Sequence, residues 1–156
     1  MVGLRPRVLY WIGRLHDLWI VLAWVGIVTG IMLNGFFHRG CYEYFAERDF
    51  TNPCQSFVDL GLIFAAAVGA GMTLIDVRVA VIGFIIVHVV SSAFFFIAIL
   101  LPALSVQTDP VLVQTLTNRS VVLTFREEFP FPVFFSLAGS GVGLYFGGKV
   151  DSFRRA

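Results

Sequence analysis

The sequence predicts an all-α integral membrane protein whose four transmembrane helices form a single domain over residues 1–156. Of the 156 residues, 58% are hydrophobic and only 13% are charged, whereas a soluble domain has about 45–50% apolar and about 25% charged residues. One small globule cannot cover so much apolar surface with a polar coat. The formal net charge of +1 provides no basic surface for phosphates, so we expect no nucleic-acid partner.

Four apolar segments are long enough, or nearly long enough, to cross a bilayer, which takes roughly 20 helical residues. The predicted spans are residues 18–37, 57–75, 79–104 and 131–148. A cleaved signal peptide is the alternative for the first segment. Its apolar run is longer than such peptides usually have, and no small-residue cleavage site follows it. We therefore expect this segment to remain as a helix of the mature protein.

The distribution of basic residues predicts that both termini lie in the cytoplasm. Seven of the eleven Lys and Arg residues fall in the terminal segments and in the turn at Asp76–Arg78, and four fall in the two longer connections. The seven are Arg5, Arg7, Arg14, Arg78, Lys149, Arg154 and Arg155. Because cytoplasmic segments carry the excess of positive charge, the expected topology is N-in and C-in, in the plasma membrane.

Both cysteines, Cys41 and Cys54, lie in the first outer connection of this topology. Outer compartments are oxidising, so a pair of thiols there usually forms a bridge. Zinc binding with His38 as a third ligand is the alternative, but two Cys and one His without a C-x-x-C motif match a zinc site poorly. We predict a structural disulfide that closes this loop, and no metal site.

The second outer connection, residues 105–129, is too long for a simple loop. Residues 111–117 and 120–125 are rich in β-branched side chains and flank Asn118-Arg119, which can form a two-residue turn. We predict a short β-hairpin that lies on the outer membrane surface and packs against the first loop. Asn118 also begins an Asn-x-Ser motif, which makes it a candidate glycosylation site.

Small residues four positions apart recur along three of the predicted spans. Within a bilayer such stripes allow helix backbones to approach closely, and they are typical of packing surfaces. The stripes are Gly26 and Gly30, then Gly61, Ala65 and Gly69, and finally Gly139, Gly143 and Gly147. Each stripe can pack within the chain or against a partner subunit, and the spacing is compatible with either.

His88 is the strongest candidate for a cofactor or proton site, because an ionisable residue within a span is costly to bury. It can bind haem iron, relay a proton or hydrogen-bond to a neighbouring helix. A second imidazole at the same depth is missing, since His16 and His38 lie near the membrane boundaries. This favours the hydrogen-bonded packing role.

Three charged residues, Arg126, Glu127 and Glu128, precede the last span. The Phe-Pro-Phe-Pro sequence that follows them forces an extended approach to the helix. We expect the triplet to form a solvated or self-paired rim at the outer mouth. Docking of a partner domain is the alternative, although rim charges contribute little to binding.

The sequence contains no nucleophile elbow, P-loop, HExxH, EF-hand or Rossmann motif. We therefore expect a non-catalytic structural or accessory subunit of a larger membrane complex, with no cofactor, whose partners are other membrane subunits and the lipid bilayer. A redox membrane protein that binds haem b or quinone near His88 is the alternative. A small transporter or channel ranks last, because the predicted spans offer no polar lining.

Overall fold

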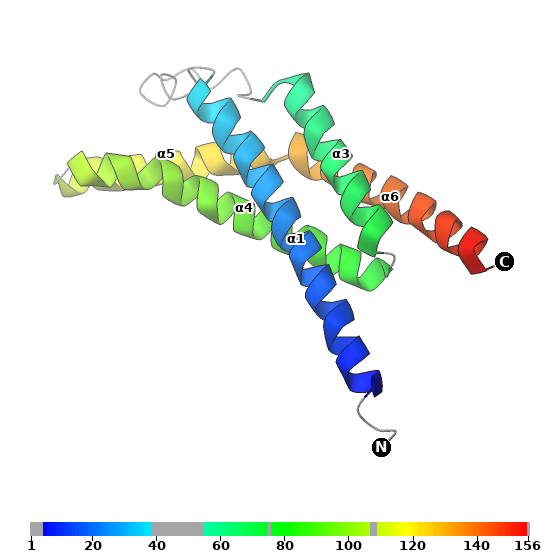
Figure 1. The fold of residues 1–156 in the computed structure, drawn as a ribbon. Helices are drawn as coiled ribbons and strands as arrows, with labels where there is room; N and C mark the ends of the chain where they lie inside the picture. The colour runs from blue at the N-terminus through cyan, green and yellow to red at the C-terminus, as the bar shows by residue number, and fades with distance from the viewer. Residues whose placement is uncertain (1–4, 39–54, 75, 107–108, 156) are drawn as a thin grey trace.

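The computed structural model describes residues 5–38, 55–74, 76–106 and 109–155, and within these ranges it is entirely helical (Figure 1). The helices are α1 (Arg5–His38), α3 (Phe57–Leu74), α4 (Val77–Val106), α5 (Pro110–Glu128) and α6 (Phe131–Arg155). Four stretches are long and apolar enough to cross a membrane: Leu15–His38, Phe57–Leu74, Val77–Pro102 and Pro110–Val150. The prediction of an all-helical chain with four stretches long and apolar enough to cross a membrane is confirmed for the described residues.

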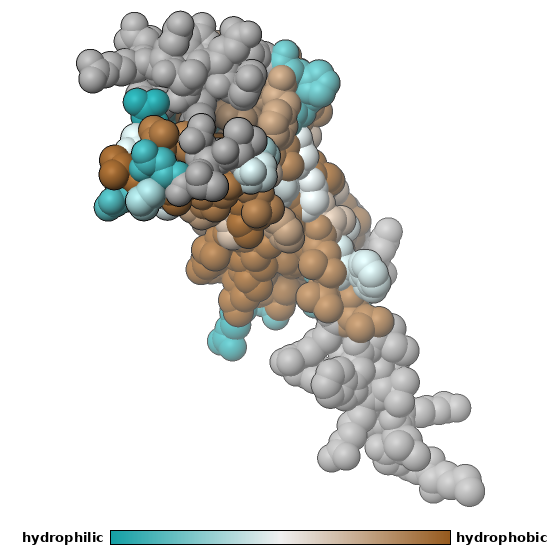
Figure 2. Space-filling model, turned by 90° about the vertical axis from the view of Figure 1, so that its left-hand side faces the viewer, coloured by the Kyte–Doolittle hydropathy of each residue, from teal (hydrophilic) through white to brown (hydrophobic). Residues whose placement is uncertain are grey.

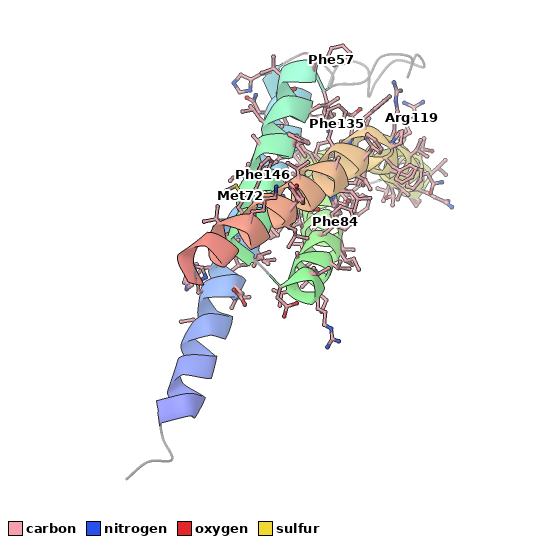
Figure 3. All side chains as sticks on the ribbon, turned by 90° about the vertical axis from the view of Figure 1, so that its right-hand side faces the viewer. Phe57, Met72, Phe84, Arg119, Phe135 and Phe146 are labelled. Carbon is pink, nitrogen blue, oxygen red and sulfur yellow. The ribbon has the colours of Figure 1, made fainter. Side chains whose placement is uncertain are left out.

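The most extensive contact in the molecule joins α3 and α6, which run parallel. Gly139 lies against Phe64 and Ala67, and further along both helices Gly147 lies against Met72. Figure 3 shows the same register, with Phe57 and Phe135 towards one end of the pair and Met72 and Phe146 towards the other.

Helices α1 and α4 also run parallel to each other. Val21 contacts Gly83, the Thr29 hydroxyl donates to the Ser91 hydroxyl at 3.1 Å, and the rings of Phe36 and Phe95 meet edge to face. These contacts follow the same order along both helices. Between them lie the largest fully buried side chains of the core, which include Trp24, Val28, Met32, Val87 and Phe95.

The turn predicted at Asp76–Arg78 joins α3 to α4. Helix α3 ends at Leu74 and α4 begins at Val77, and the Asp76 carboxylate accepts a hydrogen bond of 2.8 Å from the Arg78 backbone N–H. Since α1 and α4 run one way while α3 and α6 run the other, the start of α1 and the end of α6 lie on the side of the bundle where this turn lies (Figure 1).

The predicted β-hairpin over residues 111–125 is wrong, because Pro110–Glu128 forms the helix α5. Asp109 caps this helix, and its carboxylate accepts a hydrogen bond of 2.8 Å from the Val111 N–H. Pro110 occupies the first turn, where its missing N–H leaves no bond unmade. These helix-start signals override the β-propensity of the Val and Thr residues, which depends strongly on context.

Helix α5 folds back along the second half of α4, and the two form a helical hairpin that projects sideways from the bundle (Figure 1). It ends at Glu128, and Phe129 then adopts the extended backbone predicted before the last span, with φ −122° and ψ 137°. The next helix, α6, begins two residues later at Phe131. The last turn of α5 therefore lies where α4, α5 and α6 come together.

The outer surface of the described bundle carries many large apolar side chains, among them Leu22, Ile27, Ile82 and Phe94. On the face shown in Figure 2, hydrophobic residues form a band across the middle, and hydrophilic residues gather towards the two ends. Such a band is what a helical bundle presents to hydrocarbon. The predicted disulfide of Cys41 and Cys54 lies outside the described residues and stays a prediction.

Candidate functional site

The candidate site is a buried pair formed by His88 of α4 and Glu128 of α5. His88 is 8% exposed, and its Nδ1 is hydrogen-bonded to Oε1 of Glu128. Phe84, one turn earlier on α4, packs against the imidazole with ring centroids 4.7 Å apart. Of the three roles considered for His88, the hydrogen bond to a neighbouring helix is thus present, and its partner is an ionisable carboxyl.

The predicted solvated rim is not found at Glu127 and Glu128, which are only 4% and 7% exposed. The reason is the fold of α5, whose last turn carries both carboxyl groups into the bundle instead of leaving them above it. Only Arg126 of the triplet remains half-buried.

Three polar atoms around this pair are buried and have no hydrogen-bond partner within the described part of the chain. They are His88 Nε2, Glu128 Oε2 and Thr124 Oγ1. Thr124 precedes Glu128 by four residues, so the two side chains lie on the same face of α5. Buried polar atoms of native proteins are nearly always satisfied, so these three call for a partner such as an ordered water.

A pocket of about 390 Å³ lies beside Glu128, between α4 and α5. Ser92, Thr124 and Glu128 are among its lining residues, but the Thr124 hydroxyl and Glu128 Oε2 are buried, and the exposed wall of the pocket is almost wholly apolar. None of the lining residues is basic. The full lining is Ser92, Phe96, Val121, Thr124, Phe125, Glu128 and Phe129.

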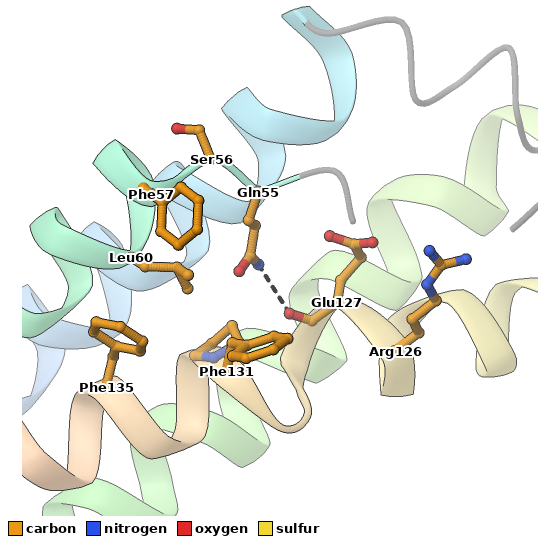
Figure 4. Close-up of a pocket in the computed structure, with 9 residues that line it drawn as sticks. Gln55, Ser56, Phe57, Leu60, Arg126, Glu127, Phe131 and Phe135 are labelled. Carbon is orange, nitrogen blue, oxygen red and sulfur yellow. Dashed lines mark hydrogen bonds between the residues drawn. The ribbon is translucent and has the colours of Figure 1, made fainter. Parts of the chain in front are cut away.

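A second pocket, of about 450 Å³, lies where the first turn of α3 faces the start of α6 (Figure 4). The Gln55 side-chain amide donates to the carbonyl oxygen of Glu127 at 2.9 Å, which ties the segment before α3 to the end of α5. Its lining is mostly aromatic and aliphatic: Gln55, Ser56, Phe57, Leu60, Arg126, Glu127, Phe131, Pro132 and Phe135.

The buried carboxylate of Asp59 has a structural role at the start of α3. It accepts hydrogen bonds from the Ser56 N–H at 2.9 Å and from the Ser56 hydroxyl at 3.1 Å. The Asp59 N–H in turn donates to the Ser56 hydroxyl oxygen at 3.3 Å. This reciprocal arrangement is a capping box, which satisfies backbone groups at the start of a helix.

The three glycine stripes have different surroundings. A Cβ on Gly143 would lie 2.2 Å from the Val68 carbonyl oxygen, and Gly139 and Gly147 are similarly close to α3. By contrast, a Cβ on four other glycines would meet no described atom within 4 Å, namely Gly26, Gly30, Gly61 and Gly69. Ala65 is exposed on the same side as the last two. Helix α3 instead uses a rotated face, with Ala67 and Gly71, to contact α6.

The other two histidines lie on α1, away from its buried face. His16 is exposed beside Asp17, with Nδ1 and Oδ1 3.7 Å apart, and His38 is exposed at the end of the helix. Within the ranges that the structure describes, no three His, Cys, Asp or Glu side chains gather closely enough to hold a metal ion.

Sequence reasoning found His88 but missed Thr124 and the burial of Glu128. Both omissions follow from the hairpin predicted for residues 111–125, which separates these side chains from α4. The signal that could have found them is Asp109-Pro110, a helix-start pair.

No family model, curated protein or solved structure matches this chain. Its function therefore has to be argued from the site and from the surfaces of its helices.

Proposed function

We propose that the chain is a non-catalytic accessory subunit of a larger membrane complex, and that it lies in the plasma membrane with both termini cytoplasmic. The observation that carries this proposal is the pair of open small-residue stripes, Gly26 with Gly30 on α1 and Gly61, Ala65 and Gly69 on α3. Helices associate in lipid through close backbone contact at small residues. Stripes that touch none of the described residues are available for contact with another subunit.

The subunit proposal predicts that enlarging the α1 stripe releases the partner. We expect the double variant Gly26→Leu with Gly30→Leu to recover at least about tenfold less partner after mild detergent extraction, because leucine holds the backbones apart. Native mass spectrometry of the tagged chain measures this. The matched control is Gly141→Leu, since Gly141 is also open but has Leu137 and Tyr145 four residues away on either side. A wild-type chain that runs as a monomer with no bound protein would refute the proposal.

We also propose the disulfide between Cys41 and Cys54, supported by the outer location that the positive-inside rule gives their loop. We expect neither thiol to react with a maleimide in the folded, unreduced protein and both to react after reduction, as mass analysis will show. Loss of the bridge is expected to lower the free energy of unfolding by about 3 kcal/mol for a loop of this size. Reaction after a chelator alone would indicate zinc instead, and reaction without treatment would refute both the disulfide and the zinc site.

Asn118 is exposed on α5, and its glycosylation is likewise a proposal.

A second candidate function is a quinone-linked redox role, which the pair of His88 and Glu128 favours. The pocket beside this pair is lined by Glu128 and not by His88. A ligand in the pocket would therefore not reach the free imidazole nitrogen of His88. This arrangement fits a hydrogen-bonded quinone better than a haem, whose iron would require the imidazole as an axial ligand.

A further inference from the structure

We propose that α5 is a lipid-facing helix that lies crosswise in the outer leaflet, and that the pocket between α4 and α5 holds an acyl chain of a membrane phospholipid. The assignment to the outer leaflet rests on the proposed orientation with both termini cytoplasmic, whereas the contact with acyl chains does not depend on it. The inference goes beyond the subunit proposal, which rests on other surfaces of the chain, namely the open stripes of α1 and α3.

Helix α5 runs crosswise to α1 and α3 and not alongside them (Figure 1). It lies towards the end of the bundle at which α1 finishes and α3 begins. The Gln55 side chain, just before α3, donates to the Glu127 carbonyl oxygen of α5, and Figure 3 shows Arg119 towards the same end as Phe57, the first residue of α3. A helix in this direction cannot cross a bilayer that α1 and α3 cross. It therefore lies either on one leaflet or within it.

The last turns of α5 have polar side chains inside and apolar side chains outside. Five side chains of the helix are buried, and all but one are polar or charged: Ser120, Leu123, Thr124, Glu127 and Glu128. The large exposed side chains of the same turns are Val121, Val122 and Phe125, and Phe125 is 68% exposed. A helix that covers a soluble core has the opposite distribution, whereas polar side chains of membrane segments face the bundle interior. The last turns of α5 therefore lie within the leaflet and face hydrocarbon.

The first half of α5 indicates that the helix slopes out of the hydrocarbon. Gln114, Thr115 and Asn118 are exposed there, together with apolar residues. Gln114 and Phe125 are eleven residues apart, which is close to three turns, so they lie on the same side of the helix. A side that changes from polar to apolar along its length fits a helix that starts among the head groups and ends among the acyl chains.

The pocket between α4 and α5 belongs to the same lipid-facing surface. Val121, Phe125 and Phe129 line it and are exposed, so the pocket opens towards the surroundings of the bundle. Phe94 of α4, close in sequence to the lining residue Phe96, is also exposed. The volume of about 390 Å³ lies within the usual range for small-molecule sites, which is about 300–1,000 Å³.

The wall of the pocket selects an acyl chain over a ligand that needs hydrogen bonds. The Thr124 hydroxyl and Glu128 Oε2 are buried, and the exposed wall is almost wholly apolar. An acyl chain makes van der Waals contact with such a wall without giving up a hydrogen bond. The quinone of the second candidate function would have to compete for the same space.

Two arginines of α5 fit contact with the head groups of the same leaflet. Arg119 and Arg126 are half-buried, and their separation of seven residues, about two turns, places them on one side of the helix. Arginine side chains at a membrane boundary cover apolar surface with their methylene groups and keep the guanidinium group in the polar layer. The two residues therefore fit a helix near the boundary between head groups and acyl chains.

Photocrosslinking of the full chain in phosphatidylcholine liposomes tests the lipid-facing surface. Phe125 is replaced by p-benzoylphenylalanine, whose excited ketone inserts into nearby C–H bonds, and mass spectrometry of the intact chain identifies the adduct. We expect at least about fivefold more phospholipid adduct at Phe125 than at Gln114, the matched position on the same side of α5, because the acyl chains lie beneath the head-group layer. Phe94, which is 55% exposed on α4, is the positive control.

Retention of lipid by the full chain tests the pocket. Native mass spectrometry of the chain released from phosphatidylcholine nanodiscs should show one tightly held phospholipid. We expect Val121→Trp to lower the retained fraction by about tenfold, which corresponds to about 1.4 kcal/mol, because the indole fills the pocket. The matched control is Val122→Trp, since Val122 is 56% exposed beside Val121 but does not line the pocket. It should retain lipid as the wild type does.

Each other outcome refutes a definite part of the proposal. Absence of a phospholipid adduct at Phe125, or an equal yield at Gln114, would overturn the lipid-facing surface, and so would an adduct formed with another protein or within the chain. Equal retention in the wild type and both tryptophan variants, or no retained lipid, would overturn the acyl-chain pocket. Retention of decylubiquinone in preference to phosphatidylcholine would overturn its occupant. A wild-type chain without a partner protein would refute the subunit proposal and leave all of these results unchanged.

Discussion

Replacing Gly143 by alanine is expected to lower the free energy of unfolding by at least about 3 kcal/mol, a large effect for one methyl group. The added Cβ would lie 2.2 Å from the carbonyl oxygen of Val68 and 2.9 Å from the backbone nitrogen of Met72. Both neighbours are backbone atoms of α3, so no side-chain rotation can relieve the overlap. The helices would have to separate along their most extensive contact.

Gly141, two residues earlier on the same helix, provides the control. A Cβ there would meet no described atom within 4 Å, and alanine favours a helix interior over glycine by roughly 0.5–1 kcal/mol. We therefore expect Gly141→Ala to leave stability unchanged or slightly higher, opposite in sign to Gly143→Ala. Unfolding in mixed micelles of increasing dodecyl sulfate content measures both variants. Equal stabilities would contradict the close parallel contact between α3 and α6.

The spans could be predicted because each is a long apolar run, and length and hydropathy alone decide that a helix can cross hydrocarbon. The packing face of α6 could also be predicted, since its Gly139, Gly143 and Gly147 all lie on one side. Helix α3 shows the limit of this reasoning. It carries small residues on two faces, and spacing alone does not indicate that the one with Gly71 meets α6 while the one with Gly61 stays open.

The candidate site could be predicted only in part, because its two halves depend on different kinds of information. The depth of His88 follows from its position within an apolar run of α4. The depth of Glu128 depends on how α5 folds back along α4, which is a tertiary feature. Local composition was misleading here, because the Val and Thr residues of α5 favour a strand in isolation, whereas packing against α4 and the cap at Asp109 give a helix.

Removing one member of the buried pair is expected to destabilise the protein strongly, whereas removing both is not. Glu128→Leu or His88→Leu alone should lower the free energy of unfolding by about 3–5 kcal/mol, since each leaves a buried ionisable group without its partner. The double variant replaces the pair by apolar side chains of similar size, and such replacements are often neutral. We therefore expect it to be more stable than either single variant.

The double-mutant cycle isolates this coupling from the effects of each substitution alone. His16→Leu is the matched control, because His16 also lies beside a carboxylate but is exposed, and exposed pairs contribute about 0–1 kcal/mol. If the losses at His88 and Glu128 simply add, the two side chains do not interact in the folded protein. A large coupling would instead show that α5 is held against α4 by this pair. The last turn of α5, with Thr124 on the same face as Glu128, would then depend for its position on this buried pair as well as on the Gln55 hydrogen bond to the Glu127 carbonyl.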